Sequence, residues 1–338
     1  MKKKTSIVDI AKSLEISPTT VSFILNGRAK EKRISDQVVE KVQKYIDEVG
    51  YKPNTLARSL RTGKTNTIGL LVESIANPFF ANIARRIEEL AYKSGYKILY
   101  SSTENDTERT KELIHLFQER HVDGYIISPP DGIEEEINTL LRSGSPVVLF
   151  DRDLPTVEAD AILIDNLCST YKAINHLITS GFKSIGFITL DSLQSQMIDR
   201  LSGYEKAMQE HELPIHIKEI SYQQSVENTV RHINSFILRN DLDAVLFATN
   251  YLGISGLKAI KELNLKIPSD IAIVAFDDHD LFELHTPPIT SISQPIEDIS
   301  TQLITTLLEK LKSKVKQKKE QHIIPANLKI RRSSQKEG

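Results

Sequence analysis

Hydrophobic and polar positions at the start of the chain follow the period of two short helices. The first apolar stripe has members three and four residues apart: Ile7, Ile10, Ala11 and Leu14. Ser6 precedes this stripe and Asp9 follows three residues later, as in a capping box. Ser17 and Pro18 predict the start of a second helix, since proline at the first helical position loses no hydrogen bond. Its buried stripe is Val21, Ile24 and Leu25.

The other face of the second helix carries short polar side chains and one ring: Thr19, Thr20, Ser22, Phe23 and Asn26. Side chains of this size can reach base edges in a major groove. Two helices this short cannot bury a core alone, so an ordinary helical hairpin of a larger domain is the alternative. The pattern favours a helix-turn-helix, with Ser6 and Ser17 at its helix starts among the candidate DNA-binding residues.

A third helix is predicted over 36–49, capped by Ser35 and ended by Gly50. Its inward positions are Val38, Val42, Tyr45, Ile46 and Val49. The stretch that follows, 51–65, is too polar for a core but contains a helix-competent run, Leu56–Leu60. Such a run is marginal alone and orders on contact, and a flexible linker is the alternative.

From Asn66 onward, apolar runs alternate with amphipathic stretches. The runs typical of strands are Thr67–Val72, Lys97–Tyr100, Gly124–Ser128, Val147–Phe150, Ile185–Thr189, Ala244–Phe247 and Ile271–Phe276. The helical stretches include Phe80–Ser94, Thr107–Glu119, Thr170–Thr179, Gly203–Glu210 and Gly253–Leu263. This alternation predicts parallel sheets covered by helices. We therefore expect an α/β protein, in which a small all-α head precedes a two-lobed, doubly wound body with a ligand cleft at the strand ends.

The expected boundaries are a head over 1–50, a hinge over 51–65 and a body over 66–338. Within the body, lobe 1 is expected over about 66–163 with 294–323, and lobe 2 over about 164–293 with 324–333.

Charge separates the head from the body. Residues 1–64 hold fourteen Lys and Arg against seven Asp and Glu, leaving 29 basic and 38 acidic residues for the rest of a chain whose net charge is −2. A cationic head favours a polyanion and makes its binding salt-dependent. The lysine-rich tract Lys310–Lys319 is interpreted as a solvated helix face, with nucleic-acid contact as the alternative.

One cysteine, Cys168, excludes an internal disulfide and a four-cysteine zinc site. The basic start has no apolar stretch behind it, and no run approaches the length of a membrane span. We expect a cytoplasmic protein that needs no metal or cofactor and does not bind a membrane.

Three separated motifs resemble the lactose and galactose repressor (LacI/GalR) family of bacterial transcription regulators. They are the head motif at Ser6–Asn26, the GY-x-PN and LARSL segment at Gly50–Leu60, and VAFDDHDLFELHTPPITSISQP at Val274–Pro295. The resemblance covers essentially the whole chain and implies a periplasmic-binding-protein-like body. It also implies a homodimer that binds operator DNA under the control of a small molecule, most simply a sugar.

The resemblance assigns roles to residues of the head and hinge. Thr19, Thr20, Ser22 and Phe23 match recognition-helix positions, although Phe23 stands where the family often has arginine, so a bidentate guanine contact is not expected. Leu60 matches the leucine that wedges into the minor groove. Its neighbours in that groove are Asn54, Ala57 and Arg58.

The resemblance also implies a set of effector-binding residues: Phe79, Phe80, Asp151, Arg152, Gln194, Gln196, Arg200, Tyr222, Asn250 and Asp277. Asn250 stands at a position where the family more usually has aspartate. Carboxylates, arginine and amides can bind vicinal hydroxyls, and aromatic faces can pack on a sugar ring. The alternatives are a core role for Tyr222 and Phe80, a structural ion pair for Arg200, and a simple turn at Asp277.

Two other classes of protein fit less well. An enzyme would need a catalytic or phosphate-binding motif, but Phe187 stands where a P-loop needs lysine and the nine histidines have no metal-ligand spacing. A transport binding protein would share the body but lack the cationic head. We therefore expect a regulator, and whether its effector releases DNA or promotes binding is left open. No terminal leucine heptad follows Pro325, which favours a dimer over a tetramer.

Leu60→Ala is expected to weaken binding to a specific operator by on the order of tenfold or more, with a much smaller loss on random duplex, because a wedge matters only where the DNA is bent. Fluorescence anisotropy with both duplexes at one salt concentration measures the difference. Equal losses on the two duplexes would contradict a wedge role and favour a plain linker.

Overall fold

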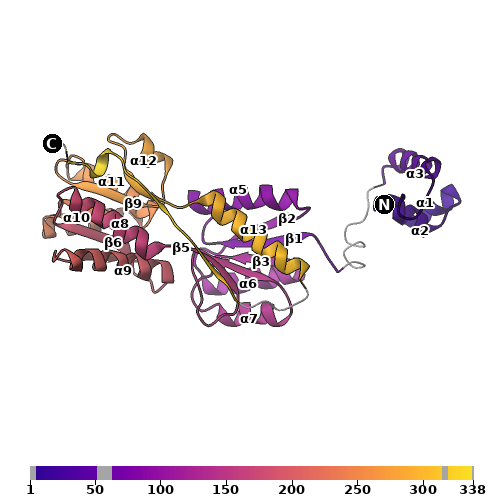
Figure 1. Cartoon of the computed structure of the whole chain (residues 1–338), viewed down its shortest axis with the longest axis horizontal. Helices are drawn as coiled ribbons and strands as arrows, with labels where there is room; N and C mark the ends of the chain where they lie inside the picture. Colours follow the sequence, from indigo (N-terminus) through magenta and orange to yellow (C-terminus); the bar gives the residue numbers. More distant parts are fainter. Residues whose placement is uncertain (1–4, 52–62, 314–318, 337–338) are drawn as a thin grey trace. The chain divides into compact units, whose positions relative to one another are not determined.

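The computed structural model describes residues 5–51, 63–313 and 319–336. It divides into two compact units, residues 1–65 and residues 66–338, which are the head and the body (Figure 1). The hinge residues assigned above by resemblance, Asn54, Ala57, Arg58 and Leu60, lie outside the described residues.

The head consists of three helices, α1 (Ile7–Leu14), α2 (Pro18–Leu25) and α3 (Asp36–Val49), around a small apolar core. Ile10, Val21 and Val42 are fully buried in this core, one from each helix. The predicted capping box is confirmed, because Ser6 Oγ accepts from the Asp9 amide and the Asp9 carboxylate accepts from the Ser6 amide. Ser17 likewise caps α2, so both helix starts were correctly predicted.

Two predictions about α3 were wrong. Ser35 occupies the N-cap position but its side chain makes no capping hydrogen bond there. Val49 is 37% exposed, while Val39 packs against the core. Val49 stands in the last turn, where the chain leaves the bundle through left-handed Gly50, so no neighbouring helix covers it.

The body is built on two six-stranded sheets. The first has the order β11-β5-β4-β3-β1-β2 and its strands all run parallel. Its strands are β1 (Thr67–Val72), β2 (Lys97–Ser102), β3 (Gly124–Ile127), β4 (Val147–Phe150), β5 (Asp160–Ile164) and β11 (Gln321–Ile324). The second sheet has the order β12-β10-β9-β8-β6-β7, with only β12 antiparallel. Its strands are β6 (Ile185–Leu190), β7 (His216–Ile220), β8 (Ala244–Phe247), β9 (Ala272–Phe276), β10 (Thr290–Ser293) and β12 (Asn327–Lys329).

Helices cover the faces of each sheet, as parallel sheets require. Around the first sheet lie α5 (Pro78–Lys93), α6 (Thr107–Glu119), α7 (Glu134–Arg142) and α13 (Ile296–Lys312). Around the second lie α8 (Asn166–Thr179), α9 (Ser195–Glu210), α10 (Val226–Asn240), α11 (Asn250–Glu262) and the short α12 (Asp280–Leu284). Figure 1 shows α5 and α13 side by side on one face of the first sheet, with α6 and α7 on the other. We call the first layered unit lobe 1 and the second lobe 2.

The chain crosses between the lobes three times: after β5, after β10 and after β11. The first and third crossings are tied together, because the Asp165 carboxylate accepts a hydrogen bond from the Ala326 amide at 2.8 Å. The second crossing contains Gln294, whose amide donates to the Asp277 carboxylate at 2.6 Å. The crossings are therefore held to one another and to lobe 2 by side-chain hydrogen bonds.

The interpretation of Lys310–Lys319 as a solvated helix face was wrong for Lys310 and Lys319, while Lys312 is exposed and 314–318 lie outside the described residues. Helix α13 ends at Lys312, and the Lys310 and Lys319 side chains are only 18% and 16% exposed. Lys310 pairs with Asp160 at 2.9 Å and Lys319 with Asp153 at 3.4 Å. These two lysines serve the packing of lobe 1, because each neutralises a buried carboxylate.

Asp278 fastens the end of the chain to lobe 2. Both its oxygens accept from the Arg331 guanidinium, and Ser291 and Lys329 donate to them as well, all between 2.6 and 2.9 Å. Partial burial raises the pKa of Asp278, but these hydrogen bonds outweigh burial and hold the pKa well below its ordinary value. A carboxyl whose pKa is lowered by folding stabilises the fold above its unfolded pKa.

Asp278→Asn is expected to lower the free energy of unfolding by on the order of 1–3 kcal/mol at neutral pH. The difference from the wild type is expected to persist down to about pH 4 and to shrink as acid protonates the folded carboxyl. Urea unfolding across this pH range measures it, with exposed Glu158→Gln as the matched control. A difference that does not depend on pH would contradict the ion-pair account.

Candidate functional site

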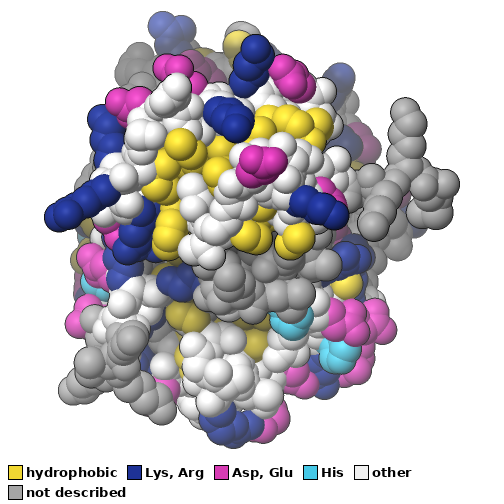
Figure 2. All heavy atoms as spheres, turned by 90° about the vertical axis from the view of Figure 1, so that its right-hand side faces the viewer, with side chains coloured by type: hydrophobic (Ala, Val, Ile, Leu, Met, Phe, Trp, Pro, Cys, Tyr) yellow, Lys and Arg dark blue, Asp and Glu magenta, His cyan; other side chains and the backbone are white. Residues whose placement is uncertain are grey.

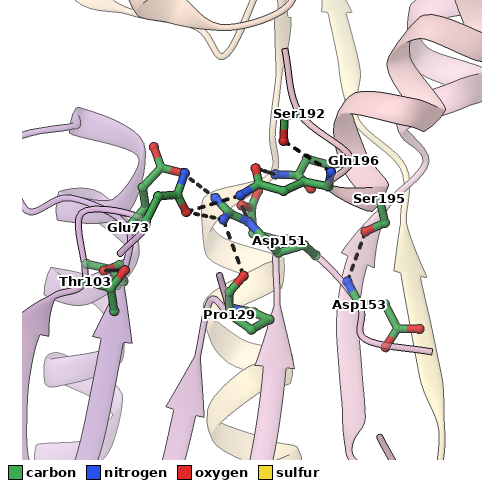
Figure 3. Close-up of polar contacts among 12 residues, drawn as sticks. Glu73, Thr103, Pro129, Asp151, Asp153, Ser192, Ser195 and Gln196 are labelled. Carbon is green, nitrogen blue, oxygen red and sulfur yellow. Dashed lines mark hydrogen bonds and ion pairs between the residues drawn. The ribbon is translucent and has the colours of Figure 1, made fainter. Parts of the chain in front are cut away.

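A buried charged cluster lies at the carboxyl ends of the lobe 1 strands. Glu73 directly follows β1, and Asp151 and Arg152 directly follow β4. The Arg152 guanidinium contacts Glu73 and Asn105, donates to Asp151 Oδ2 at 3.2 Å and approaches the Pro129 carbonyl at 3.4 Å (Figure 3). Burial raises the pKa of Glu73, which Arg152 only partly opposes. This cluster concentrates charge and directional hydrogen bonds in a dry site.

A second buried cluster lies at the carboxyl ends of the lobe 2 strands. Arg200, on α9, donates through Nε to Asn166 at 2.8 Å and through Nη1 to the Ala248 carbonyl at 2.6 Å. Its Nη1 lies 3.9 Å from Asp277 Oδ2, and its guanidinium stacks on Phe276 at 3.6 Å from the ring centroid. Arg200 is 2% exposed. Whether it serves as an ion-pair partner or as a ligand contact, its guanidinium acts inside an enclosed site.

The two clusters share one local arrangement, an aspartate directly after a phenylalanine that ends a strand. Asp151 follows Phe150 at the end of β4, and Asp277 follows Phe276 at the end of β9. Both aspartates have a left-handed backbone, with φ of 69° and 64°. Aspartate tolerates this conformation better than most residues. Each carboxylate then lies beside a buried guanidinium.

Hydrogen bonds between described residues join the lobes across the cleft. The Gln194 amide donates to Asn105 Oδ1 at 3.3 Å, and the Asp153 backbone amide donates to Ser195 Oγ at 3.1 Å. Asn250 at the start of α11 donates to Asn77 Oδ1 at 3.1 Å, and Asn77 also caps α5. The two lobes are therefore joined directly by these hydrogen bonds.

Two cavities open onto the cleft. One of about 380 Å³ lies between the segment Glu104–Thr107 of lobe 1 and residues of lobe 2 that include Asp191, Gln194 and Tyr222. The other, of about 180 Å³, lies within lobe 2 and shares Tyr222. Tyr251 lines this second cavity and meets Tyr222 edge to face, with ring centroids 6.3 Å apart. Burial raises the pKa of the Tyr222 hydroxyl, and the Glu73 and Glu104 carboxylates raise it further.

Of the predicted effector residues, Gln194 and Tyr222 line these cavities, while Asp151, Arg152, Arg200 and Asp277 lie in the two buried clusters. Phe79 and Phe80 are buried in the apolar core, edge to face with each other, and Phe80 also meets Phe150. Neither ring lines the two cavities. Gln196 is buried beside Gln194 and donates to its amide oxygen at 3.2 Å (Figure 3).

Several polar residues of the cleft were not predicted: Glu73, Asn77, Asn105, Asn166, Tyr251 and Gln294. The sequence contains one signal for these residues. Glu73 is a carboxylate directly after the strand-like run Thr67–Val72, where polar groups of a cleft are expected.

In the head, the predicted contact face of α2 is partly engaged in its own hydrogen bonds. The Thr20 and Ser17 hydroxyls bond to each other at 2.8 Å, and the Asn26 amide donates to the Ser22 carbonyl at 2.6 Å. Thr19 is exposed and Phe23 is partly exposed. On the face that it draws, Figure 2 shows hydrophobic side chains exposed among Lys and Arg side chains.

Phe23 has two cations against its ring. Arg28 and Lys32 lie 5.7 and 5.4 Å from the ring centroid. Phe23 therefore lies at a cationic part of the head surface rather than in the fully buried core.

Within the described residues, no helix combines the length and apolar character needed to cross a bilayer. The same residues include no grouping of His, Cys, Asp and Glu that could hold a metal ion.

A three-helix head with a helix-turn-helix, followed by two α/β lobes around a polar cleft, defines a DNA-binding regulator with a periplasmic-binding-protein-like body. Residues 6–54 match the bacterial regulatory proteins of the lacI family, and residues 174–334 match the periplasmic binding protein-like domain. The HTH-type transcriptional regulator DegA of Bacillus subtilis is 30% identical over 335 residues, which cover 98% of each chain. The chain belongs to the lacI family, and it is a transcriptional regulator rather than an enzyme.

Other known proteins support this assignment. The ribose operon repressor of Haemophilus influenzae is 30% identical over 90% of this chain and 91% of its own. The lac repressor dimer bound to operator and the anti-inducer ONPF shares the fold, with a TM-score of 0.87 at 22% identity, over 99% of this chain and 100% of that one. A lacI family regulator from Enterococcus faecium with bound ribose has a TM-score of 0.71 at 25% identity, over 80% of this chain and 98% of its own.

Phe23→Ala is expected to change base preference at one position of the operator half-site, by about 1 kcal/mol, while effector binding stays as in the wild type. The reason is that the ring lies partly exposed on the face of α2 opposite Val21 and Ile24. Binding to a pool of half-site variants measures the preference, and Val8→Ala, which removes an exposed apolar side chain from α1, is the control. A lower melting temperature with unchanged preference would place Phe23 in the core of the head.

Proposed function

We propose that this protein is a repressor whose affinity for operator DNA is controlled by a sugar or sugar derivative bound between the two lobes. The observation that carries the proposal is the pair of buried guanidinium–carboxylate clusters, Arg152 with Glu73 and Arg200 with Asp277, on the two sides of one cleft. Such groups hold vicinal hydroxyls through paired hydrogen bonds. The aromatic faces of Tyr222 and Tyr251 add apolar surface for the C–H side of a sugar ring.

Known relatives support both parts of this proposal. The ribose operon repressor is named for a sugar operon, and the Enterococcus faecium regulator holds ribose. The DNA-binding residues proposed for this chain are those of the α2 face, together with the hinge residues that the resemblance assigns. The head's excess of basic residues supplies the phosphate contacts that such binding needs.

We further propose that the regulator acts as a homodimer. A near-palindromic operator presents two equivalent half-sites, which a two-fold dimer matches. On lobe 2, an open groove of about 810 Å³ lies between α11 and α12, with Leu281 and Leu284 exposed by 51% and 79%. A second copy of the chain covering this groove would remove those side chains from water.

Control of DNA binding then follows from the lobes. An effector that contacts both clusters favours one relative position of the lobes over another. In a dimer, this position sets the distance between the two hinges. The effector thus changes operator affinity to the extent that it binds one lobe arrangement more tightly than the other.

Arg200→Met and Asp277→Asn are each expected to bind operator as the wild type does, and to lose the response to effector. Each lost charge-assisted hydrogen bond should weaken effector binding by about 30- to 150-fold. The operator is first selected from a random duplex pool, and the effector is found by thermal stabilisation with a carbohydrate panel. Calorimetry and operator titration then compare each variant with the wild type.

Asp278→Asn is the matched control, because it removes the neighbouring carboxylate, which bonds to Arg331 and lies outside the cleft clusters. It should keep the effector response. Wild-type effector affinity in both Arg200→Met and Asp277→Asn would overturn the cleft assignment, and absence of any preferred duplex would overturn the proposed control of operator binding.

A further inference from the structure

The charged groups that line the cleft are mostly acidic. The cavity of about 380 Å³ has three carboxylates in its wall, from Glu104, Asp106 and Asp191, and the described residues that line it include no lysine or arginine. Asp106 also caps α6, so it is fixed in place by the Arg109 amide at 2.7 Å. A ligand entering this cavity therefore meets negative charge first.

The cations deeper in the cleft are already paired. Arg152 contacts the carboxylates of both Glu73 and Asp151. Arg200 has Asp277 at 3.9 Å, and the Asp151 carboxylate also acts on it. Three buried carboxylates thus face two buried guanidinium groups. An anionic ligand would therefore have to compete with these carboxyl groups for guanidinium groups that are already paired.

One buried polar atom beside the cavity lacks a hydrogen-bond partner and can be satisfied only by a donor. Gln196 is 3% exposed, and its Oε1 has no hydrogen-bond partner among the described residues. Its amide nitrogen bonds to Gln194, which lines the cavity. Only a donor such as a hydroxyl or an N–H group can satisfy this oxygen. The anionic group of a sugar phosphate or uronic acid brings acceptors alone, so this oxygen needs one of the ligand's hydroxyl or N–H groups.

We propose that the effector of this cleft is a polyhydroxy compound that carries no anionic group, so that the phosphorylated or carboxylated form of the same compound is rejected. The inference rests on the effector site of the proposed function and specifies the chemistry of its occupant. Hydroxyls both donate and accept, so they can pair with Gln196 Oε1 and with the carboxylates together.

The test uses the full-length protein and matched sets of sugars. Each set contains one neutral monosaccharide, its phosphate monoester, its uronic acid and its amino sugar, and thermal stabilisation is followed by calorimetry. For any set that binds, we expect the phosphate and the uronic acid to bind at least about 100-fold more weakly than the neutral parent. A phosphate or uronic acid that binds as tightly as its parent overturns the proposal.

Two variants locate the source of the discrimination. Glu104→Gln combined with Asp191→Asn is expected to reduce discrimination against the phosphate by on the order of tenfold at low salt, because two like charges are removed from the cavity wall. Glu112→Gln, an exposed carboxylate on α6 that does not line the cavity, is the matched control and should leave the ratio as it is. An unchanged ratio in the double variant would overturn the role of these carboxylates.

A wider library of metabolites separates this inference from the proposed function. If a neutral or cationic compound that is not a sugar binds, the sugar assignment fails. The inference that the site rejects anionic ligands, here called the charge rule, then stands. If an anionic compound is the tightest ligand, the charge rule fails while effector control stands. If no compound of any charge binds, both are contradicted.

Discussion

The direction of the strands is the constraint on which the body depends. With every strand but β12 parallel to its neighbours, the carboxyl ends of a whole sheet meet along one edge. Glu73 and Asp151, which follow central strands of the lobe 1 sheet, are therefore brought to one edge although they are far apart in the sequence, and Asp277 stands at the corresponding edge of the lobe 2 sheet. The backbone at these ends has left the hydrogen-bonded ladder, so polar side chains are accommodated there without disturbing the apolar sheet.

Burial explains why the charged residues of the cleft occur as groups. A single guanidinium in the position of Arg200 or Arg152 would be very costly to remove from water. Carboxylates, amides and backbone carbonyls around each one offset that cost. Because of this arrangement, several hydrogen-bond donors of the two arginines already have protein partners before a ligand binds. Binding therefore involves an exchange of partners within an existing network rather than the filling of an empty charged pocket.

The sequence predicts what local patterns encode. The strands β1, β4 and β8 have the bounds that their apolar runs predicted, and the helix caps of the helix-turn-helix follow from Ser6 with Asp9 three residues on and from Ser17 directly before Pro18. The edge strand β7 was not predicted, because it is only partly buried and carries His216, Lys218 and Glu219. Contacts such as Arg152 with Glu73, 79 positions apart, have no local pattern at all. They become visible only when the sheet order is known.

The bond between Asn77 and Asn250 has a consequence for how related sequences should be compared. Asn77 Oδ1 accepts from the Phe79 amide at the start of α5 and from the Asn250 amide across the cleft. An aspartate at position 250, the residue more usual there, would set two acceptors against each other. The identity of residue 250 is therefore conditional on residue 77, 173 positions earlier. Relatives that have aspartate at position 250 should be aligned with attention to whether position 77 still offers an acceptor.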